Sequence, residues 1–259
     1  MSEVRNLLYR KPELYEVMYP ETDEATPKLC LRLFKKYIGR IPSSILDVAC
    51  GTGRDLAVLA RQCSDCVGID ISSEMIQFAK SKRPHLRFEL GDMRTFRLGR
   101  TFDAVLCLGS ALMYAHTDQD VDRTLATFRA HCHNGSLLVL DIRNAIGFLP
   151  GGCEFKERLE TTVNTPDFTA TVVSTQSFDR RKQRMIRRRT WQIPGREAVE
   201  DYCEYRMFFP AELERLLTEN GFDVLDIFDN KDTKETDLSG RRLYVAAQYH
   251  AQPSHRGDG

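Results

Sequence analysis

Short apolar runs alternate with helical periodicities between Ile45 and about Ile142. The runs are rich in β-branched residues, whereas apolar residues recur every three to four positions in the segments between them. This alternation is typical of a parallel sheet with helices on its faces. The predicted strands are Ser44–Val48, Cys66–Asp70, Leu86–Leu90, Phe102–Leu108 and Ser136–Ile142. The predicted helices are Gly53–Gln62, Ser72–Arg83 and Asp118–Cys132, the last with an apolar stripe of Val121, Leu125, Phe128 and Cys132.

After Ile142 the pattern changes to successive strands separated by turn residues, which predicts an inserted antiparallel meander. Its expected strands are Cys153–Thr162, Phe168–Phe178, Arg184–Ile193 and Ala198–Phe209. Pro210 then opens a helix over Ala211–Asn220, and two last strands follow at Asp223–Phe228 and Arg242–Tyr249. The sequence therefore predicts an α/β protein with a doubly wound, Rossmann-like sheet of seven strands.

Five segments are expected along the chain. Residues 1–42 form an N-terminal helical cap, 43–150 the Rossmann-like core, and 151–209 the antiparallel β insertion. Residues 210–250 return to the core with a helix and its last two strands, and the polar tail 251–259 is expected to be disordered.

Composition narrows the range of partners and locations. The 259 residues include 37 basic and 37 acidic ones, and this neutral balance argues against DNA as a partner. No apolar run is long enough to span a membrane, and the charged start does not resemble a signal peptide, so we expect a cytoplasmic protein with no membrane partner. Eight cysteines are then expected as reduced thiols. The Cys63-Ser-Asp-Cys66 pair has the spacing of half a zinc site, but no second pair completes it. His131-Cys132-His133 is assigned to the end of a helix, so no metal site is expected.

The strongest candidate for chemistry is Ile45-Leu46-Asp47-Val48-Ala49-Cys50-Gly51-Thr52-Gly53-Arg54-Asp55, in which a buried strand runs through a glycine turn into a helix. Gly51 and Gly53 allow close approach of the backbone to a ligand, and the helix start offers N–H groups to a polar group. Asp47 is expected to orient this loop. Asp70 ends the next strand nineteen residues after Gly51, where a carboxylate can accept hydrogen bonds from both hydroxyls of a ribose. Asp92 and Met93 follow the third strand, where a carboxylate and an N–H group suit an adenine ring.

Together these motifs resemble the class I S-adenosylmethionine (SAM) dependent methyltransferases, with Phe102–Leu108 similar to their fourth-strand motif. A nicotinamide dinucleotide protein is the structural rival, but it usually has a third glycine where Leu56 stands here. The resemblance implies SAM as cofactor, S-adenosylhomocysteine as product and no metal. It implies cofactor contacts from Tyr19, Ala49, Gly51, Gly53, Arg54, Asp70, Ile71, Asp92, Met93 and Leu108.

A closer resemblance is to the N,N-dimethyltransferases that act on nucleotide-linked amino sugars in macrolide biosynthesis. The matching stretches are Glu13-Leu14-Tyr15-Glu16, Leu46–Gly53, Gly91-Asp92-Met93-Arg94, Arg184-Met185 and Ser239-Gly240-Arg241-Arg242-Leu243-Tyr244-Val245. That resemblance implies a small-molecule, phosphate-bearing acceptor facing Tyr15 and Arg241, and homodimer contacts through the β insertion. Two departures affect the acceptor pocket: Tyr114 replaces the family's histidine, and Ile142-Arg143-Asn144 replaces its Pro-Trp-Trp, which makes Arg143 a further candidate for substrate binding.

Candidate catalytic residues are Tyr15, Tyr114 and His116, with Asp141 as a further candidate neighbour of the acceptor. An amine acceptor needs only to be deprotonated, whereas a hydroxyl acceptor usually needs a general base. The sequence favours N-methylation of a small molecule in natural-product biosynthesis. It leaves open an O- or C-methyltransferase, and a SAM-binding regulatory protein without turnover. For His116 the alternative is an exposed loop histidine.

Basic residues occupy seven of the ten positions from Arg180 to Arg189. On a strand, Arg187 and Arg189 share a face with Met185 and Trp191, while Arg184 and Arg188 lie on the other face. One interpretation is a solvated hairpin and outer sheet face. The other is a patch that attracts a phosphate-bearing acceptor, because guanidinium groups match phosphate oxygens.

Overall fold

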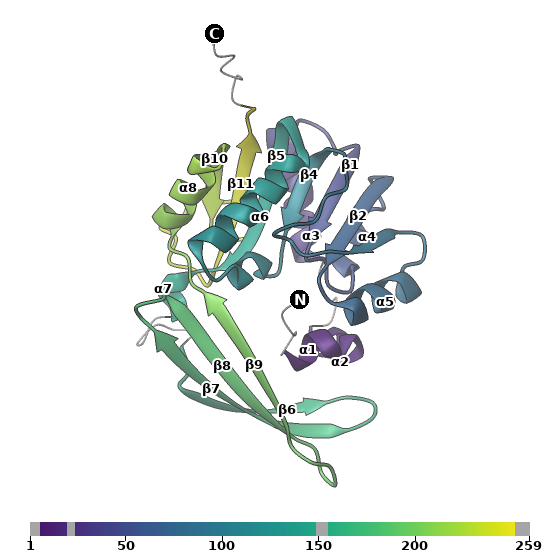
Figure 1. Ribbon diagram of the computed structural model, residues 1–259, viewed down its shortest axis with the longest axis vertical. Coiled ribbons are helices and arrows are strands. Elements are labelled where there is room, and N and C mark those ends of the chain that lie inside the picture. Colours follow the sequence, from purple (N-terminus) through teal and green to yellow (C-terminus); the bar gives the residue numbers. More distant parts are fainter. Residues whose placement is uncertain (1–5, 20–23, 149–154, 252–259) are drawn as a thin grey trace.

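A computed structural model of the chain describes residues 6–19, 24–148 and 155–251, which form two sheets (Figure 1). The larger sheet has the strand order β10-β11-β5-β4-β1-β2-β3, in which β11 runs antiparallel to both β5 and β10. Its strands are β1 Ser44–Val48, β2 Asp65–Asp70, β3 Arg87–Leu90, β4 Phe102–Cys107, β5 Cys132–Arg143, β10 Phe222–Phe228 and β11 Arg242–Tyr249. The predicted doubly wound sheet of seven strands is confirmed.

Helices cover both faces of this sheet. On one face α3 (Ala25–Tyr37), α4 (Arg54–Leu59) and α5 (Ser73–Lys82) contribute buried side chains such as Phe34, Leu56 and Ile76. On the other face lie α6 (Asp118–Ala130) and α8 (Pro210–Glu219), whose Leu125 and Leu217 are fully buried. Burial on both faces explains why the strands are almost continuously apolar.

The predicted antiparallel insertion is also confirmed. Its strands pair in the order β6-β7-β8-β9, with bounds β6 Arg158–Asn164, β7 Thr169–Asp179, β8 Arg184–Gln192 and β9 Val199–Arg206. The start of the first expected strand, Cys153, lies outside the described residues, as does the tail from 252. In Figure 1 this meander lies below the large sheet, and β6 and β9 are its two edge strands.

The N-terminal helices α1 (Leu7–Arg10) and α2 (Pro12–Met18) pack against the inner face of the meander (Figure 1). Leu8 and Leu14 join Val172 and Trp191 in a separate apolar cluster. A buried polar network reinforces it, because Arg189 donates hydrogen bonds to Asp201 at 2.8 Å and to the Asn6 side chain at 2.7 Å. We call α1 and α2 the lid, since they cover the space between the meander and the large sheet.

One helix boundary predicted from the sequence is wrong. Helix α6 ends at Ala130, and Cys132 pairs with Phe102 as the first residue of β5, so Cys132 is not part of the helical stripe. The buried imidazole of His131 ends the helix: it contacts the Thr127 carbonyl at 2.8 Å and accepts the Leu98 N–H at 2.9 Å. The chain therefore passes from helix α6 to strand β5 within the segment His131–His133.

Candidate active site

A cavity of about 580 Å³ opens at the carboxyl ends of β1, β2 and β4, beneath the lid. Parallel α/β sheets place ligand sites at this edge. Eleven of the predicted site residues line it: Tyr15, Ala49, Gly51, Arg54, Asp70, Ile71, Asp92, Met93, Leu108, Tyr114 and His116. The sequence motifs therefore meet in one place although they are spread over a hundred positions.

Three residues of the glycine turn have left-handed backbone conformations. Ala49, Gly51 and Gly53 have φ values of 61°, 56° and 77°. A Cβ atom on Gly51 would meet no heavy atom within 4 Å, so the backbone there faces open space in the cavity. Gly53 serves a different purpose, because a Cβ atom there would lie 2.4 Å from the Phe88 ring.

We expect Gly53→Ala to lower the free energy of unfolding by about 2–4 kcal/mol, since it adds a ring clash to a left-handed φ. Gly99→Ala is the matched control: Gly99 also has a positive φ, of 68°, but has open space around it, so we expect a loss of about 1 kcal/mol. Denaturant unfolding measures both values. Equal losses in the two variants would contradict the assigned role of Phe88.

Asp70 connects the glycine turn to the next loop. Its Oδ2 accepts the Gly51 N–H at 2.8 Å, and its Oδ1 accepts the Ser72 N–H at 2.9 Å. Burial raises the pKa of Asp70, and these N–H donors oppose that shift. A carboxylate has about four acceptor positions. Asp70 also lines the cavity, where the acceptor positions left on its oxygens suit the hydroxyls of a bound ribose.

At the adenine end, Asp92 is already paired with Arg94. The Arg94 guanidinium donates to both carboxylate oxygens, at 2.6 Å from Nη2 to Oδ2 and 2.9 Å from Nε to Oδ1. Burial alone would raise the pKa of Asp92, but Arg94 lowers it below the ordinary value. Arg94 also contacts Asp120 at 3.3 Å. Asp92 was predictable from its motif, whereas the role of Arg94 in orienting it was not.

The methionine end provides a test of fit for the implied cofactor. Thr52 lines the cavity, is 1% exposed, and its hydroxyl has no hydrogen-bond partner among the described residues. A buried hydroxyl without a partner is costly, and a polar ligand group removes that cost. Arg54 lies nearby, with its guanidinium 5.2 Å from the Tyr15 ring and a hydrogen bond to the Tyr19 carbonyl. These residues fit the amino acid part of SAM.

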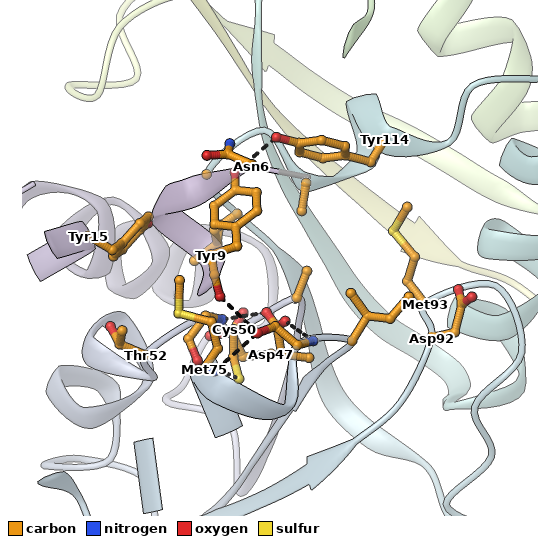
Figure 2. A pocket seen from close by; sticks show the side chains of 18 of the residues that line it. Asn6, Tyr9, Tyr15, Asp47, Cys50, Thr52, Met75, Asp92, Met93 and Tyr114 are labelled. Carbon is orange, nitrogen blue, oxygen red and sulfur yellow. Dashed lines mark hydrogen bonds between the residues drawn. The ribbon is translucent and has the colours of Figure 1, made fainter. Parts of the chain in front are cut away.

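Beyond this end the cavity is lined by tyrosines from two distant segments, with a third tyrosine packed behind them. Tyr9 and Tyr15 come from the lid, Tyr114 from the 3₁₀ helix η1 (Ala111–Tyr114), and Tyr205 of β9 packs behind them. The Tyr114 hydroxyl donates to that of Tyr9 at 3.1 Å, and Figure 2 shows the two side chains pointing towards each other. We call this group the tyrosine chamber.

The tyrosine chamber is uncharged near neutral pH. Burial raises the pKa of Tyr9, Tyr15 and Tyr114 well above the ordinary value, and raises that of Tyr205 to about 12. A protonated phenol can orient an acceptor through its hydroxyl but is a poor proton acceptor.

Two other candidate bases are held by protein groups. The ring Nε2 of His116 donates to the Glu204 carbonyl at 2.9 Å, and His116 is half-buried in the cavity wall rather than an exposed loop residue. Asp141 accepts a hydrogen bond from Arg242 Nε at 2.6 Å, and this ion pair balances the negative charge of the carboxylate.

Four predicted site residues do not line the cavity. Gly53 lies behind the turn, and Tyr19 contacts the site through Arg54 and through the Tyr15 ring at 5.1 Å. The Arg143 guanidinium lies 5.2 Å from the Phe148 ring, and the Arg241 carbonyl accepts the Asn144 N–H at 3.0 Å. The substrate contacts expected for Arg143 and Arg241 remain predictions.

Sequence reasoning missed several lining residues, including Asn6, Tyr9, Cys203 and Glu204. None belongs to a motif, and they reach the cavity only because the lid and β9 fold over it. The repeated tyrosines of the lid were the one signal in the sequence that pointed to this wall.

Replacing Tyr114 by phenylalanine is expected to lower kcat/KM by about two- to tenfold, the effect of one neutral hydrogen bond. Because burial keeps the pKa of Tyr114 far above neutrality, the pH profile between pH 6 and 9 should keep its shape. Steady-state kinetics across this range test both points. A thousandfold loss together with a missing ionisation would identify Tyr114 as a base instead.

Comparisons with known proteins find similarity to methyltransferases. A family model described as "Methyltransferase domain" matches residues 45–135. The chain is 37% identical, over 99 residues, to dTDP-3-amino-3,4,6-trideoxy-alpha-D-glucopyranose N,N-dimethyltransferase of Streptomyces venezuelae, a match covering 38% of this chain and 42% of that protein. The chain spans about two fifths of the length of the first curated relatives it matches.

Solved structures cover more of the chain. Streptomyces venezuelae DesVI superposes with a TM-score of 0.72 and 27% identity, over 93% of this chain and 98% of that one. CalS10 from Micromonospora echinaspora, an amino pentose methyltransferase solved with SAM, has a TM-score of 0.72 at 24% identity, over 96% and 99% of the two chains.

The fold and the cavity resemble those of SAM-dependent methyltransferases, and the residues that line the cavity fit SAM as cofactor. The more specific resemblance, to the N,N-dimethyltransferases of nucleotide-linked amino sugars, is also confirmed. No helix in the described part of the chain is long and apolar enough to cross a membrane.

Proposed function

We propose that this protein transfers a methyl group from SAM to the amine nitrogen of a nucleotide-linked amino sugar, or of a close analogue, in natural-product biosynthesis. The observation that supports it best is the tyrosine chamber, which adjoins the methionine end of the cofactor site and whose phenols stay protonated near neutral pH. An amine acceptor suits such a site because its own lone pair attacks once it is deprotonated.

The bound cofactor supplies an electrophilic methyl group on a sulfonium. The protein's residues contribute alignment and exclusion of water. Tyr15 and Arg54 form the wall near the sulfonium end, and the hydroxyls of Tyr9 and Tyr114 orient the acceptor through hydrogen bonds. The lid closes the cavity. Tyr9 of the lid and Asn6 just before it line the cavity, and Leu8 and Leu14 anchor the lid on the meander.

Two features support an enzyme over a SAM-binding regulator. The cavity continues past the cofactor residues into the tyrosine chamber, which leaves room for an acceptor. The curated relative from Streptomyces venezuelae is an N,N-dimethyltransferase of a dTDP-linked amino sugar, and CalS10 is an amino pentose methyltransferase. An O-methyltransferase is less well supported, because the phenols of the tyrosine chamber are poor bases and Asp141 is paired with Arg242.

A matched pair of acceptors tests the proposal: a nucleotide-linked 3-amino sugar and the same sugar nucleotide with a 3-hydroxyl group. Each is incubated with the protein and SAM, and the products are weighed by mass spectrometry. We expect the amine to gain one or two methyl groups and the hydroxyl compound to stay unchanged. Methylation of the hydroxyl compound at a comparable rate would contradict an amine-specific site.

We also propose that the meander joins two copies of the chain. Strand β6 lies at the outer edge of its sheet, and Leu159 on it is 45% exposed. An exposed edge strand is a ready partner for another chain. Light scattering after gel filtration should give a dimer, and Leu159→Lys should shift it to monomer. A wild-type monomer would contradict this arrangement.

A further inference from the structure

The turn between β4 and η1 brings Leu108, Gly109 and Tyr114 to the wall of the cavity. Gly109 and Ser110 have left-handed backbone conformations, with φ values of 63° and 71°. This conformation is costly for a residue with a side chain, so a serine keeps it only where its surroundings hold it. Ser110 is 3% exposed, and its carbonyl accepts the Met113 N–H at 3.2 Å at the start of η1. The position of Tyr114 at the end of η1 therefore depends on how this turn is held.

Arg242, the first residue of β11, holds the turn together with Asp141 of β5. The Arg242 Nη2 donates to the Ser110 hydroxyl at 3.1 Å, and its Nε donates to Asp141 Oδ1 at 2.6 Å. The backbone carbonyl of Asp141 accepts the Ser110 N–H at 2.8 Å, and its Oδ2 accepts the Gly109 N–H at 3.4 Å. The side chains of Asp141 and Arg242 are 6% and 29% exposed. Hydrogen bonds between charged groups are stronger than neutral ones, and burial reduces their screening, so this pair suits the support of a strained turn.

We propose that Arg242 is a positioning residue for methyl transfer: with Asp141 it fixes the turn before η1 and thereby the place of Tyr114 in the tyrosine chamber. Arg242 is not among the described residues that line the cavity, so it acts through the turn rather than on a ligand. Small displacements matter at such a site, because transfer needs the acceptor aligned with the methyl group. The inference rests on the proposed function for the reaction, but the hold of Arg242 on the turn can be measured without an acceptor.

The test compares Arg242→Met with Arg40→Met. Arg40 has the same kinds of partner at the opposite edge of the sheet, because it donates to Asp103 Oδ2 at 2.9 Å and to the Ser43 hydroxyl at 3.2 Å. Hydrogen exchange of the protein without ligands is followed by mass spectrometry of its peptides. In Arg242→Met the peptides covering 108–116 should exchange at least about tenfold faster, while those of β2 keep the wild-type rate. In Arg40→Met the peptides covering 108–116 should keep the wild-type rate.

Wild-type exchange of 108–116 in Arg242→Met would overturn the proposal. Equal acceleration in all peptides would also overturn it, since that result reflects a general loss of stability. Ser110→Ala decides the question if Arg242→Met does not fold, because it removes the hydroxyl and leaves the ion pair in place. It should accelerate exchange of the same peptides at least about threefold, and an unchanged rate would contradict the role of the Arg242–Ser110 hydrogen bond.

Kinetics then show whether the turn matters for the reaction. With a nucleotide-linked 3-amino sugar, Arg242→Met should lower kcat at least about tenfold. The affinity for S-adenosylhomocysteine should stay within about threefold of wild type, because Gly51 and Asp70 hold each other on other loops.

A role through Tyr114 also predicts a coupled double variant. In the Arg242→Met background, Tyr114→Phe should lower kcat/KM by less than about twofold, because the hydroxyl is already misplaced. Losses that simply multiply would overturn the link between Arg242 and Tyr114. If the wild-type protein methylates no amino sugar nucleotide, the proposed function fails, and hydrogen exchange still decides whether Arg242 fixes the turn.

Discussion

Asp70→Ala is expected to weaken SAM binding at least about 100-fold. The variant removes the acceptors for two ribose hydroxyls, and hydrogen bonds to a charged group contribute about 1.5–3 kcal/mol each. It also frees the Gly51 and Ser72 N–H groups that Asp70 holds at 2.8 and 2.9 Å, so the glycine turn loses its fixed conformation. Calorimetric titration with S-adenosylhomocysteine measures the loss.

Asp65→Ala is the matched control for this prediction. Asp65 begins the same strand, β2, but at the opposite end of the sheet, where it forms an exposed ion pair with Arg100. Exposed pairs contribute little, so the affinity should stay within about twofold of wild type. If Asp70→Ala binds as tightly as Asp65→Ala, the ribose assignment is wrong.

Arg189→Met is expected to have the largest effect on stability, a loss of about 3–5 kcal/mol, because it leaves the buried Asp201 without its counter-charge. The side chains of Arg189 and Asp201 are 5% and 0% exposed. Asp201 also accepts from the Trp191 indole at 3.0 Å and from the Leu7 N–H at 3.3 Å. The pair therefore connects the meander to the lid.

Thermal unfolding should show a fall of roughly 6–20 °C in Tm for Arg189→Met, at 2–4 °C per kcal/mol for a chain of this size. The double variant with Asp201→Asn should recover part of the loss, because it removes the uncompensated charge. Arg188→Met serves as the exposed control, with an effect within about 0.5 kcal/mol. No recovery in the double variant would indicate that packing of the arginine stem, rather than charge pairing, stabilises the lid.

Most of the large sheet could be predicted from local pattern. Ser44–Val48 and Arg242–Tyr249 form strands with the predicted bounds, since continuous apolar runs suit strands buried on both faces. The glycine turn and Asp70 were also predictable, because short-range spacing determines how a strand, a turn and a ribose acceptor follow one another. Cys132 was assigned to a helix because its spacing matches the helical stripe. The contacts of His131, which end that helix, come from a distant loop.

The acceptor side of the site was less predictable, because long-range packing assembles it. Tyr9, Tyr114 and Tyr205 are close in space and far apart in sequence. The run of basic residues from Arg180 to Arg189 was visible in the sequence, and the shared inner face of Arg187 and Arg189 agrees with their burial. The register between β8 and β9 decides which of these arginines has a carboxylate partner. The composition of the run does not contain that information.

Transfer of a methyl group from SAM to an amine in the tyrosine chamber can be followed with an isotope label. The protein is incubated with SAM carrying a trideuterated methyl group and a nucleotide-linked 3-amino sugar, and fragment masses locate the label. The proposed function predicts that one or two trideuteromethyl groups appear on the sugar nitrogen and that Asp70→Ala abolishes the product at limiting SAM. Label on a hydroxyl oxygen, or no transfer by a protein that binds SAM, would contradict it.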